Sequence, residues 1–133
     1  MGKQFVGGCM RIFKCKKCGK IIVITKEGAD STVCCGEDMV ELKANSVDAA
    51  VEKHVPVVDN NDGIITVTCG EVIHPMEENH YIEFMIVETN KGYSIKYLNP
   101  GEEPICKFII SDDEELISAY AYCNLHGLWI NNK

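Results

Sequence analysis

Two pairs of cysteines in the first third of the chain have the spacing of metal ligands. Cys15 and Cys18 enclose two lysines, and Cys34 and Cys35 are adjacent in sequence. Four thiolates delivered by two turns suit a tetrahedral ion such as zinc or iron. Because adjacent side chains diverge, Cys34 and Cys35 can reach one ion only from a bent backbone. The pattern predicts a distorted four-cysteine site that holds either a structural zinc or an iron that carries electrons.

A second set of metal-binding side chains lies further along the chain, and it consists of His54, His74, His80, Cys123 and His126. A single histidine is more often an ordinary polar residue than a ligand, but each of these lies next to a turn or a proline. Four imidazoles and one thiolate are one donor too many for a closed tetrahedral site and one too few for an octahedron. The set suits iron or copper and predicts a six-coordinate ion with one position open to a small ligand.

The elements that must position these donors are predicted to be strands. Segments rich in β-branched and aromatic residues lie at residues 21–25, 64–68, 81–88, 93–98, 105–111 and 119–122. Turn signals lie at residues 59–63, 90–92 and 99–101. Short strands at regular spacing over about 85 residues predict a β-sandwich or barrel.

Helix signals are weak. Ser46 followed by residues 47–52 predicts one or two helical turns. Ser111 and Glu114 match a capping box, which we interpret as an acidic turn into a strand because the aromatic residues that follow favour β-structure.

Charge and cysteine content change near residue 44. Through Ala44 the chain has eight basic and five acidic residues, a net charge of +3, and from Asn45 onward it has five basic and fifteen acidic residues, a net charge of -10. We therefore expect two domains, residues 1–44 and 45–133. The first is too small to fold by apolar burial alone and requires a metal or disulfides.

Composition excludes several classes of protein. A net charge of -7 argues against binding to nucleic acid, which requires a basic surface. No apolar run approaches the roughly 20 residues that span a bilayer, and no secretory leader opens the chain. We expect a cytoplasmic protein without membrane partners, in which disulfides are rare and cysteines bind metal or fill the core.

Three segments together resemble the superoxide reductases. They are residues 52–57 (EKHVPV), 74–82 (HPMEENHYI) and 122–129 (YCNLHGLW). With the four cysteines of the first site ahead of them, the chain is similar to the desulfoferrodoxins, the two-iron form of that family. The resemblance covers residues 11–130, and residues 1–9 extend beyond the usual family start.

The resemblance implies an all-β fold with two iron sites. A small desulforedoxin-like domain with a rubredoxin-type iron, or a zinc in its place, is followed by a seven-stranded immunoglobulin-like sandwich. The resemblance also implies that the sandwich iron has four equatorial histidines (His54, His74, His80 and His126) and the axial ligand Cys123. Family members are commonly homodimers, and a homodimer is expected here.

The activity implied by the resemblance is the one-electron reduction of superoxide to hydrogen peroxide. Superoxide enters opposite Cys123, and Lys53 attracts this anion to a protein whose net charge repels it. Glu52 binds the oxidised iron after the product leaves. Electrons come from an external donor, and the lysines around the first site form a basic face that suits an acidic, rubredoxin-like protein: Lys14, Lys16, Lys17 and Lys20.

Two other classes of function stay open at this point. One is a non-catalytic module in which a zinc ribbon is joined to a sandwich that binds a partner, and the other is an electron carrier that uses both metals. Likewise, the basic face is equally compatible with an ordinary solvated surface. Three cysteines match no family ligand: we interpret Cys69 and Cys106 as small hydrophobic core residues within strands, and Cys9 has no assigned role.

Overall fold

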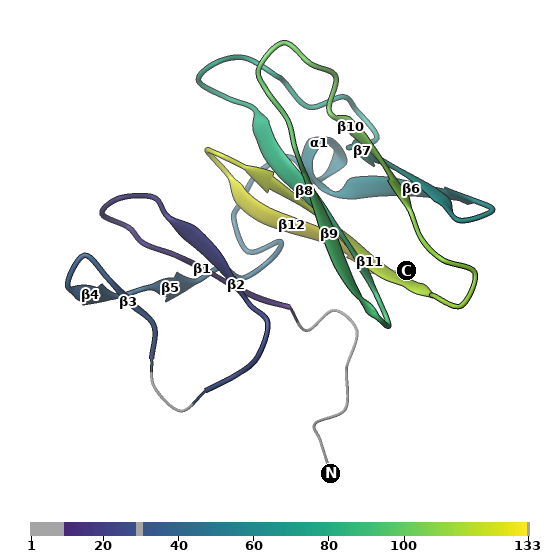
Figure 1. The fold of residues 1–133 in the computed structure, drawn as a ribbon. Coiled ribbons are helices and arrows are strands. Elements are labelled where there is room, and N and C mark those ends of the chain that lie inside the picture. The colour runs from purple at the N-terminus through teal and green to yellow at the C-terminus, as the bar shows by residue number, and fades with distance from the viewer. Residues whose placement is uncertain (1–9, 29–30, 133) are drawn as a thin grey trace. The chain divides into compact units, whose positions relative to one another are not determined.

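The computed structural model describes residues 10–28 and 31–132 of the chain. These residues divide into two compact units, residues 10–43 and 44–132. Both units consist almost entirely of antiparallel strands and tight turns (Figure 1). The predicted all-β class is confirmed. No helix among the described residues has the length and apolar character needed to cross a membrane.

The small unit contains very short strands and little core. Its described strands are β1 (Arg11–Lys14), β2 (Ile21–Ile24), β3 (Val33–Cys34), β4 (Glu37–Asp38) and β5 (Val40–Glu41). Strand β1 lies between β2 and β5 in one sheet, and β3 and β4 form a separate hairpin. The buried apolar residues described in this unit are Ile12, Cys15 and Met39. Such a core is too small to offset the conformational entropy of folding, so this unit depends on what its cysteines bind.

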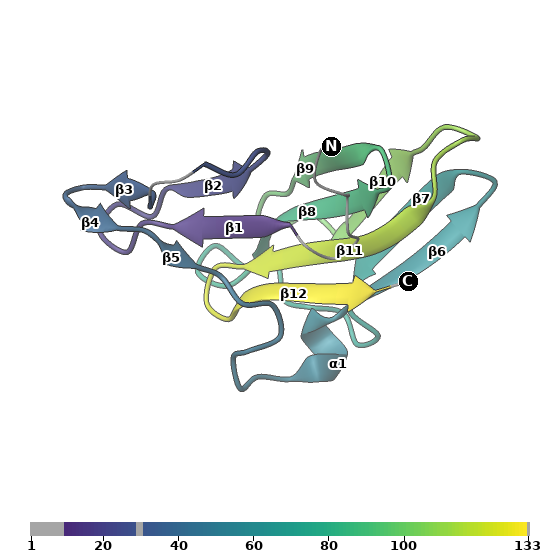
Figure 2. The same ribbon diagram turned by 90° about the horizontal axis from the view of Figure 1, so that it is seen from below.

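The large unit is a sandwich of two antiparallel sheets (Figures 1 and 2). One sheet has the order β10-β7-β6 and the other has the order β12-β11-β8-β9. The strands described here are β6 (Pro56–Asn61), β7 (Ile64–Cys69), β8 (Ile82–Thr89), β9 (Gly92–Tyr97), β10 (Ile105–Ile109), β11 (Leu116–Cys123) and β12 (Gly127–Asn132). The predicted seven-stranded sandwich is therefore confirmed.

One of the predicted ligands, Cys123, lies on the face of a strand that also contributes to the hydrophobic core. Ala119, Ala121 and Cys123 point to the same face of β11, since successive side chains of a strand alternate between its two faces. This face belongs to the hydrophobic core, in which all three residues are fully buried. Because Cys123 is the last residue of β11, its thiol lies where the core ends.

The turns agree with the prediction in kind and differ in length. Strand β6 continues through Asn61, so the predicted turn over residues 59–63 is limited to Asp62 and Gly63, with φ of 52° and 85°. Two consecutive positive φ values are typical of the tight hairpin turns that match strand twist. Glu114 accepts a hydrogen bond from the backbone N–H of Ser111 at 2.7 Å, and no helix follows. The interpretation as an acidic turn is confirmed.

The predicted helix over residues 47–52 is misplaced. The structure has a single helical turn, α1 (Val51–His54), which leads into β6 (Figure 2). Ala50 precedes it without a side-chain cap. Four residues are far fewer than an isolated helix needs to be stable, so contacts with the rest of the sandwich determine where this turn begins.

Candidate metal centres

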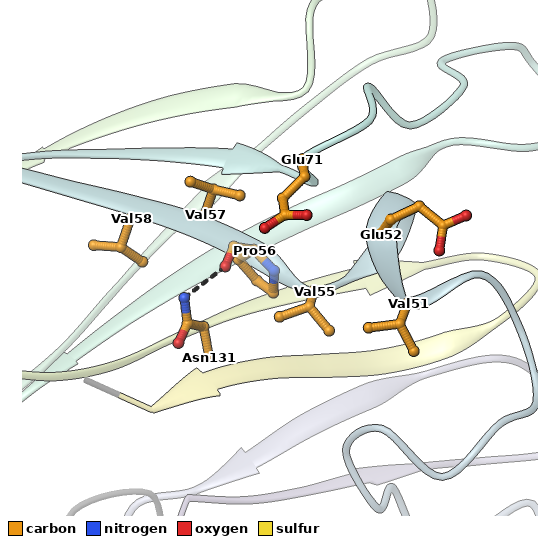
Figure 3. Close-up of a pocket in the computed structure, with 8 residues that line it drawn as sticks. All are labelled: Val51, Glu52, Val55, Pro56, Val57, Val58, Glu71 and Asn131. Carbon is orange, nitrogen blue, oxygen red and sulfur yellow. Dashed lines mark hydrogen bonds between the residues drawn. The ribbon is translucent and has the colours of Figure 1, made fainter.

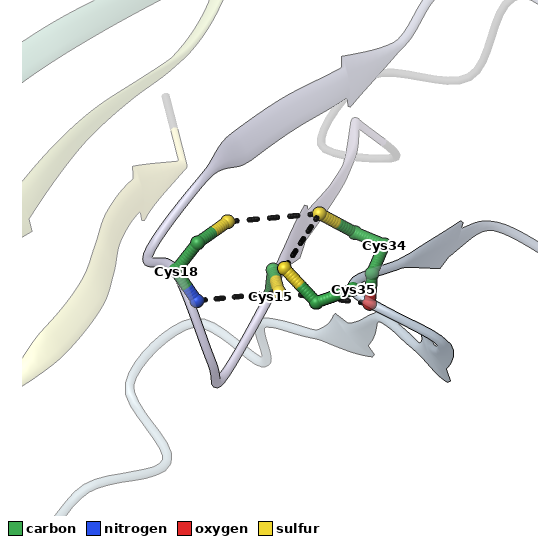
Figure 4. Close-up of side chains that lie close together, drawn as sticks. All are labelled: Cys15, Cys18, Cys34 and Cys35. Carbon is green, nitrogen blue, oxygen red and sulfur yellow. Dashed lines mark hydrogen bonds between the residues drawn. The ribbon is translucent and has the colours of Figure 1, made fainter.

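The four cysteines of the first site converge from two turns of the small unit. Cys15 and Cys18 lie in the turn between β1 and β2, whereas Cys34 and Cys35 lie where β3 turns into β4 (Figure 4). Their four sulfur atoms lie within 4.8 Å of one another. Cys35 and Gly36 both have positive φ, 54° and 77°. This pair of left-handed residues supplies the bent backbone that adjacent ligands require.

The sulfur spacing fits a tetrahedral ion. Cys34 Sγ lies 3.6 Å from Cys18 Sγ and 3.9 Å from Cys35 Sγ. Thiolates bound about 2.3 Å from a tetrahedral ion are about 3.8 Å apart. The backbone N–H of Cys18 approaches Cys15 Sγ at 3.5 Å, and this hydrogen bond lowers the pKa of Cys15 to about 6. The site therefore suits zinc or iron, which bind thiolates rather than thiols.

The four histidines of the large unit form a closed ring. Each imidazole meets two others edge to face, at interplanar angles between 78° and 84°. The distances between ring centroids around the cycle are 4.6 Å for His54–His74, 4.8 Å for His74–His80, 5.2 Å for His80–His126 and 4.9 Å for His126–His54. Four side chains far apart in sequence therefore direct their edges at a common centre.

The nitrogen spacing distinguishes a square from a tetrahedron. His54 Nε2 lies 3.1 Å from His74 Nε2 and 3.1 Å from His126 Nδ1. Nitrogens bound about 2.1 Å from an ion are about 3.0 Å apart at a right angle and about 3.4 Å apart at a tetrahedral angle. The spacing of His54 from His74 and from His126 therefore fits a right angle at an ion better than a tetrahedral angle.

Cys123 lies to one side of this ring. Its sulfur is 4.0 Å from His126 Nδ1 and within 4.8 Å of the donor nitrogens of His54, His74 and His80. An atom this close to opposite corners of the ring must lie above or below its plane rather than beside it. This place is compatible with the axial role that the resemblance implies for the thiol. Four of the five predicted donors, His54, His74, His80 and Cys123, lie within 4.8 Å of one another, and His126 adjoins them through its contacts with His54 and Cys123.

Hydrogen bonds outside the ring orient two of the imidazoles. His54 Nδ1 donates to the carbonyl of Ala50 and His74 Nδ1 donates to the carbonyl of Pro75, both at 2.7 Å. Each Nε2 therefore keeps its lone pair for a metal. Burial lowers the pKa of His54, and it lowers the pKa of His74 to about 4, so both rings are neutral at neutral pH.

His80 provides a separate test of whether a metal fits. Its Nε2 is buried and has no hydrogen-bond partner among the described residues. Buried polar atoms normally have a partner, and a lone pair directed at a ring of other imidazoles gains one when a cation is bound. Together with the square arrangement, this fits the iron or copper predicted from the donor set.

Burial and backbone hydrogen bonds act in opposite directions on the axial thiol. Burial raises the pKa of Cys123, while hydrogen bonds from the backbone N–H groups of Leu125 and His126 lower it. These N–H groups therefore stabilise the thiolate that a metal binds. Burial also raises the pKa of Cys69, to about 12, so that residue is a neutral thiol. Cys69 and Cys106 are both buried in strands, as predicted, whereas Cys9 lies outside the described residues.

Trp129 and Asn124 support the ring, and the sequence analysis assigned no role to either. The indole of Trp129 stacks on His54 with centroids 4.8 Å apart, and its N–H donates to the carbonyl of His126 at 3.0 Å. Asn124 accepts from the N–H of Tyr81 at 2.9 Å and donates to the carbonyl of Asn79 at 3.1 Å. Asn124 thereby fixes the loop of His80 to the turn that carries Cys123. Both residues lie inside a recognised motif segment, but only the folded structure shows what they contact.

The two predicted catalytic residues occupy different surroundings. Lys53 is half-buried, and its positive charge adds to burial in lowering the pKa of His54 and of His80. Glu52 is exposed and lies outside the converging donor atoms found in the described residues. It lines a groove of about 610 Å³ together with Val51, Val55, Pro56, Val57, Val58, Glu71 and Asn131 (Figure 3).

Comparison with known proteins gives matches over both units. The desulfoferrodoxin family model matches residues 46–132, and the model of the desulfoferrodoxin N-terminal domain matches residues 9–42. A desulfoferrodoxin homolog from Archaeoglobus fulgidus is 42% identical over 120 residues, which cover 90% of this chain and 94% of that protein. A desulfoferrodoxin from Nitratidesulfovibrio vulgaris is 44% identical over 119 residues, with coverage of 89% and 92%.

A solved structure has a similar fold over both units. The crystal structure of the superoxide reductase from Treponema pallidum matches with a TM-score of 0.78 and 32% sequence identity. The match covers 92% of this chain and 98% of that chain.

Proposed function

The chain belongs to the desulfoferrodoxin family, and we propose that it is a superoxide reductase with one iron ion in each metal site. The observation that carries the proposal is the closed ring of four imidazoles with the Cys123 thiol close to it. Five donors leave one of six positions of an octahedral ion for a small ligand. The similarity to the Treponema pallidum superoxide reductase supports the same activity.

An iron ion held by these residues would supply one electron for the reduction of superoxide, which with two protons gives hydrogen peroxide. The described side chains then have three tasks. The imidazoles and thiol hold the ion, a cation draws the anionic substrate towards it, and backbone N–H groups control the thiolate.

Lys53 draws superoxide to the site. A net charge of -7 repels an anion at long range, so a local positive charge must attract it at short range. The Lys53 ammonium forms no ion pair within the part of the chain that the structure describes, and its charge acts on His54 and His80. An unneutralised cation next to the ring suits this role.

Glu52 closes the site after hydrogen peroxide leaves. It lies on the same helical turn as Lys53 and His54, and its carboxylate is exposed. The side chain is therefore free to rotate from the groove shown in Figure 3 towards the ring. A carboxylate at this place would be a suitable further ligand for an iron ion held by the ring.

Cys123 sets how strongly the axial position donates electron density. Thiolate ligands donate strongly, and hydrogen bonds to the sulfur moderate that donation. The N–H groups of Leu125 and His126 act on Cys123 in this way. The turn after β11 therefore tunes the reactivity of the site without contacting the substrate.

The small unit receives electrons from an external donor and takes part in electron transport. Lys16, Lys17 and Lys20 are exposed around the cysteine site, where Lys17 pairs with Glu37 at 3.6 Å. Together with Lys14 they suit an acidic, rubredoxin-like donor. We propose domain limits at residues 1–44 and 45–133, a homodimer, and a role in removing superoxide from the cytoplasm during oxidative stress.

Iron quantitation combined with a visible spectrum tests the proposed function. We expect two irons per chain and a thiolate charge-transfer band that appears when ferricyanide or peroxide oxidises the sandwich site. Zinc in both sites without colour would instead support a non-catalytic binding module. Two irons without a fast reaction with superoxide would support an electron carrier.

A further inference from the structure

Helix α1 carries both the proposed steering residue Lys53 and the ligand His54, yet it is only four residues long. Such a helix has almost no intrinsic stability. The last four carbonyls of an α-helix also lack partners within the helix, and here they include every carbonyl of α1. Whatever binds these carbonyls therefore determines where Lys53 and His54 lie.

One of the four carbonyls accepts a hydrogen bond locally, and the other three face donors in residues 69–72, at the end of β7 and just after it. The carbonyl of Val51 accepts from the N–H of Val55 at 3.0 Å. The carbonyl of Glu52 accepts from the N–H of Val72 at 2.9 Å. The next two carbonyls, of Lys53 and His54, lie 3.4 Å and 3.1 Å from the sulfur of Cys69.

Cys69 differs from Cys106, a second buried thiol that lies outside the metal-ligand clusters of the described residues. Its side chain is fully buried, and its sulfur lies within hydrogen-bond distance of two carbonyls, of which that of His54 is the nearer. Cys106 lies on β10, which pairs with the same strand β7. Its side chain is also buried, but its thiol is within hydrogen-bond distance of no partner among the described residues. Cys69 therefore has a polar role that Cys106 lacks.

Gly70 allows this segment to approach α1 closely. A β-carbon at position 70 would lie 2.6 Å from the carbonyl oxygen of Glu52 and 2.8 Å from the carbonyl carbon of Lys53. Both neighbours are backbone atoms and cannot rotate away. The N–H of His74 donates to the carbonyl of Cys69 at 3.0 Å, so the same segment also leads into a second ligand.

We propose that residues 69–72 form a carbonyl clamp that positions Lys53 and His54. The N–H of Val72 binds the carbonyl of Glu52, the S–H of Cys69 donates to the carbonyl of His54 or of Lys53, and Gly70 provides the close approach. Cys69 is a positioning residue rather than a catalytic one, because it acts through the backbone of α1. The consequence for catalysis rests on the proposed function, whereas the clamp itself does not.

Amide hydrogen exchange of the full-length, iron-loaded protein tests the clamp directly. Cys69→Val keeps the approximate volume and removes the donor, and Cys69→Ser keeps a donor. We expect Cys69→Val to accelerate exchange at the Val55 and Val72 amides about tenfold, because it removes one hydrogen bond. Cys69→Ser, which keeps a donor, should change the exchange rate less than about twofold. The matched variants Cys106→Val and Cys106→Ser should leave both amides at the wild-type rate.

Equal exchange in Cys69→Val and wild type, or equal acceleration in Cys69→Val and Cys69→Ser, would overturn the proposal. Gly70→Ala provides a second test that does not depend on the thiol. It should displace the backbone of residues 52 and 53 and accelerate exchange at Val72 by more than Cys69→Val does. Wild-type exchange in Gly70→Ala would also contradict the clamp.

The link to catalysis has its own measurement. Cys69→Val should reduce the ionic-strength dependence of the reaction with superoxide, because Lys53 is no longer held in place, while Cys69→Ser should retain it. An unchanged dependence in Cys69→Val would overturn the positioning role. Absence of any reaction in the wild-type protein would refute the proposed function instead, and the exchange result would still decide whether the clamp exists.

Discussion

The two metal centres are built in opposite ways. In the small unit the ligands lie on two turns, Cys18 and Cys35 are exposed, and sulfur spacings of 3.6 and 3.9 Å fit a tetrahedron. In the large unit His54 and His74 are buried, and nitrogen spacings of 3.1 Å fit a square. The first unit has little apolar core, whereas the sandwich has an extensive hydrophobic core of its own. The comparison indicates that the metal stabilises the fold of the small unit, whereas the fold of the large unit positions its metal.

Metal removal should have the largest effect, and it should unfold the small unit while the sandwich stays folded. Structural metals in small domains supply most of the folding free energy, about 10–16 kcal/mol for zinc fingers. After chelation we expect amides in residues 10–43 to exchange at unfolded rates, while those of β7, β8 and β11 stay protected. Hydrogen exchange before and after chelation measures this. Retained amide protection in both units would contradict the proposal that only the small unit needs its metal to fold.

Cys123→Ser should abolish function at the sandwich centre alone. Loss of the axial thiolate removes the charge-transfer band and the reductase activity, while the spectrum of the four-cysteine site persists. Visible spectroscopy and a superoxide assay on the same preparation measure both. Cys106→Ser is the matched control, because it changes another buried thiol of the sandwich. An active, coloured Cys123→Ser protein would exclude the axial assignment.

Trp129→Phe should weaken metal binding at the sandwich centre by about 10- to 100-fold, the usual effect of removing an outer hydrogen bond to a ligand. Phenylalanine keeps the stack on His54 but loses the N–H that binds the carbonyl of His126. Competition with a chelator measures iron retention. Phe84→Leu, which removes a stacked aromatic residue that faces Tyr122 instead, should leave the affinity unchanged. Equal losses in both variants would mean that Trp129 acts only through packing.

Lys53→Ala should have the smallest effect, a several-fold slower reaction with superoxide at low salt and a weaker dependence on ionic strength. The measurement is the rate constant as a function of salt concentration. Lys91→Ala is the control, because it removes the same positive charge from another place. Lys91 lies on the β8–β9 hairpin and pairs with Asp113 in the loop that precedes β11. Identical salt dependence in the two variants would remove Lys53 from the role of steering residue.

Much of the ligand set could be predicted because it depends on residue type and local spacing. Cys15 and Cys18 enclose a single turn, and the need for a bent backbone at Cys35 followed from adjacency alone. The strands of the sandwich core were also predictable, since long β-branched runs have few alternatives. The donor count pointed to a site with an open position before the geometry was known.

Other features depend on contacts between distant segments. Strand β12 was not predicted, because it begins at Gly127 and ends in asparagines that favour turns. The role of Trp129 requires the register that pairs it with Ala121. Helix α1 begins at Val51 rather than further upstream because tertiary contacts, including those of Cys69, determine where a single turn forms. Local sequence carries no signal for such contacts.

The reaction of the reduced protein with a pulse of superoxide, followed by product analysis, tests the central claim most directly. We predict that each superoxide consumed oxidises one sandwich iron and yields one hydrogen peroxide, with no release of dioxygen. Release of dioxygen together with peroxide, or no oxidation of the sandwich iron on the timescale of the pulse, would contradict it.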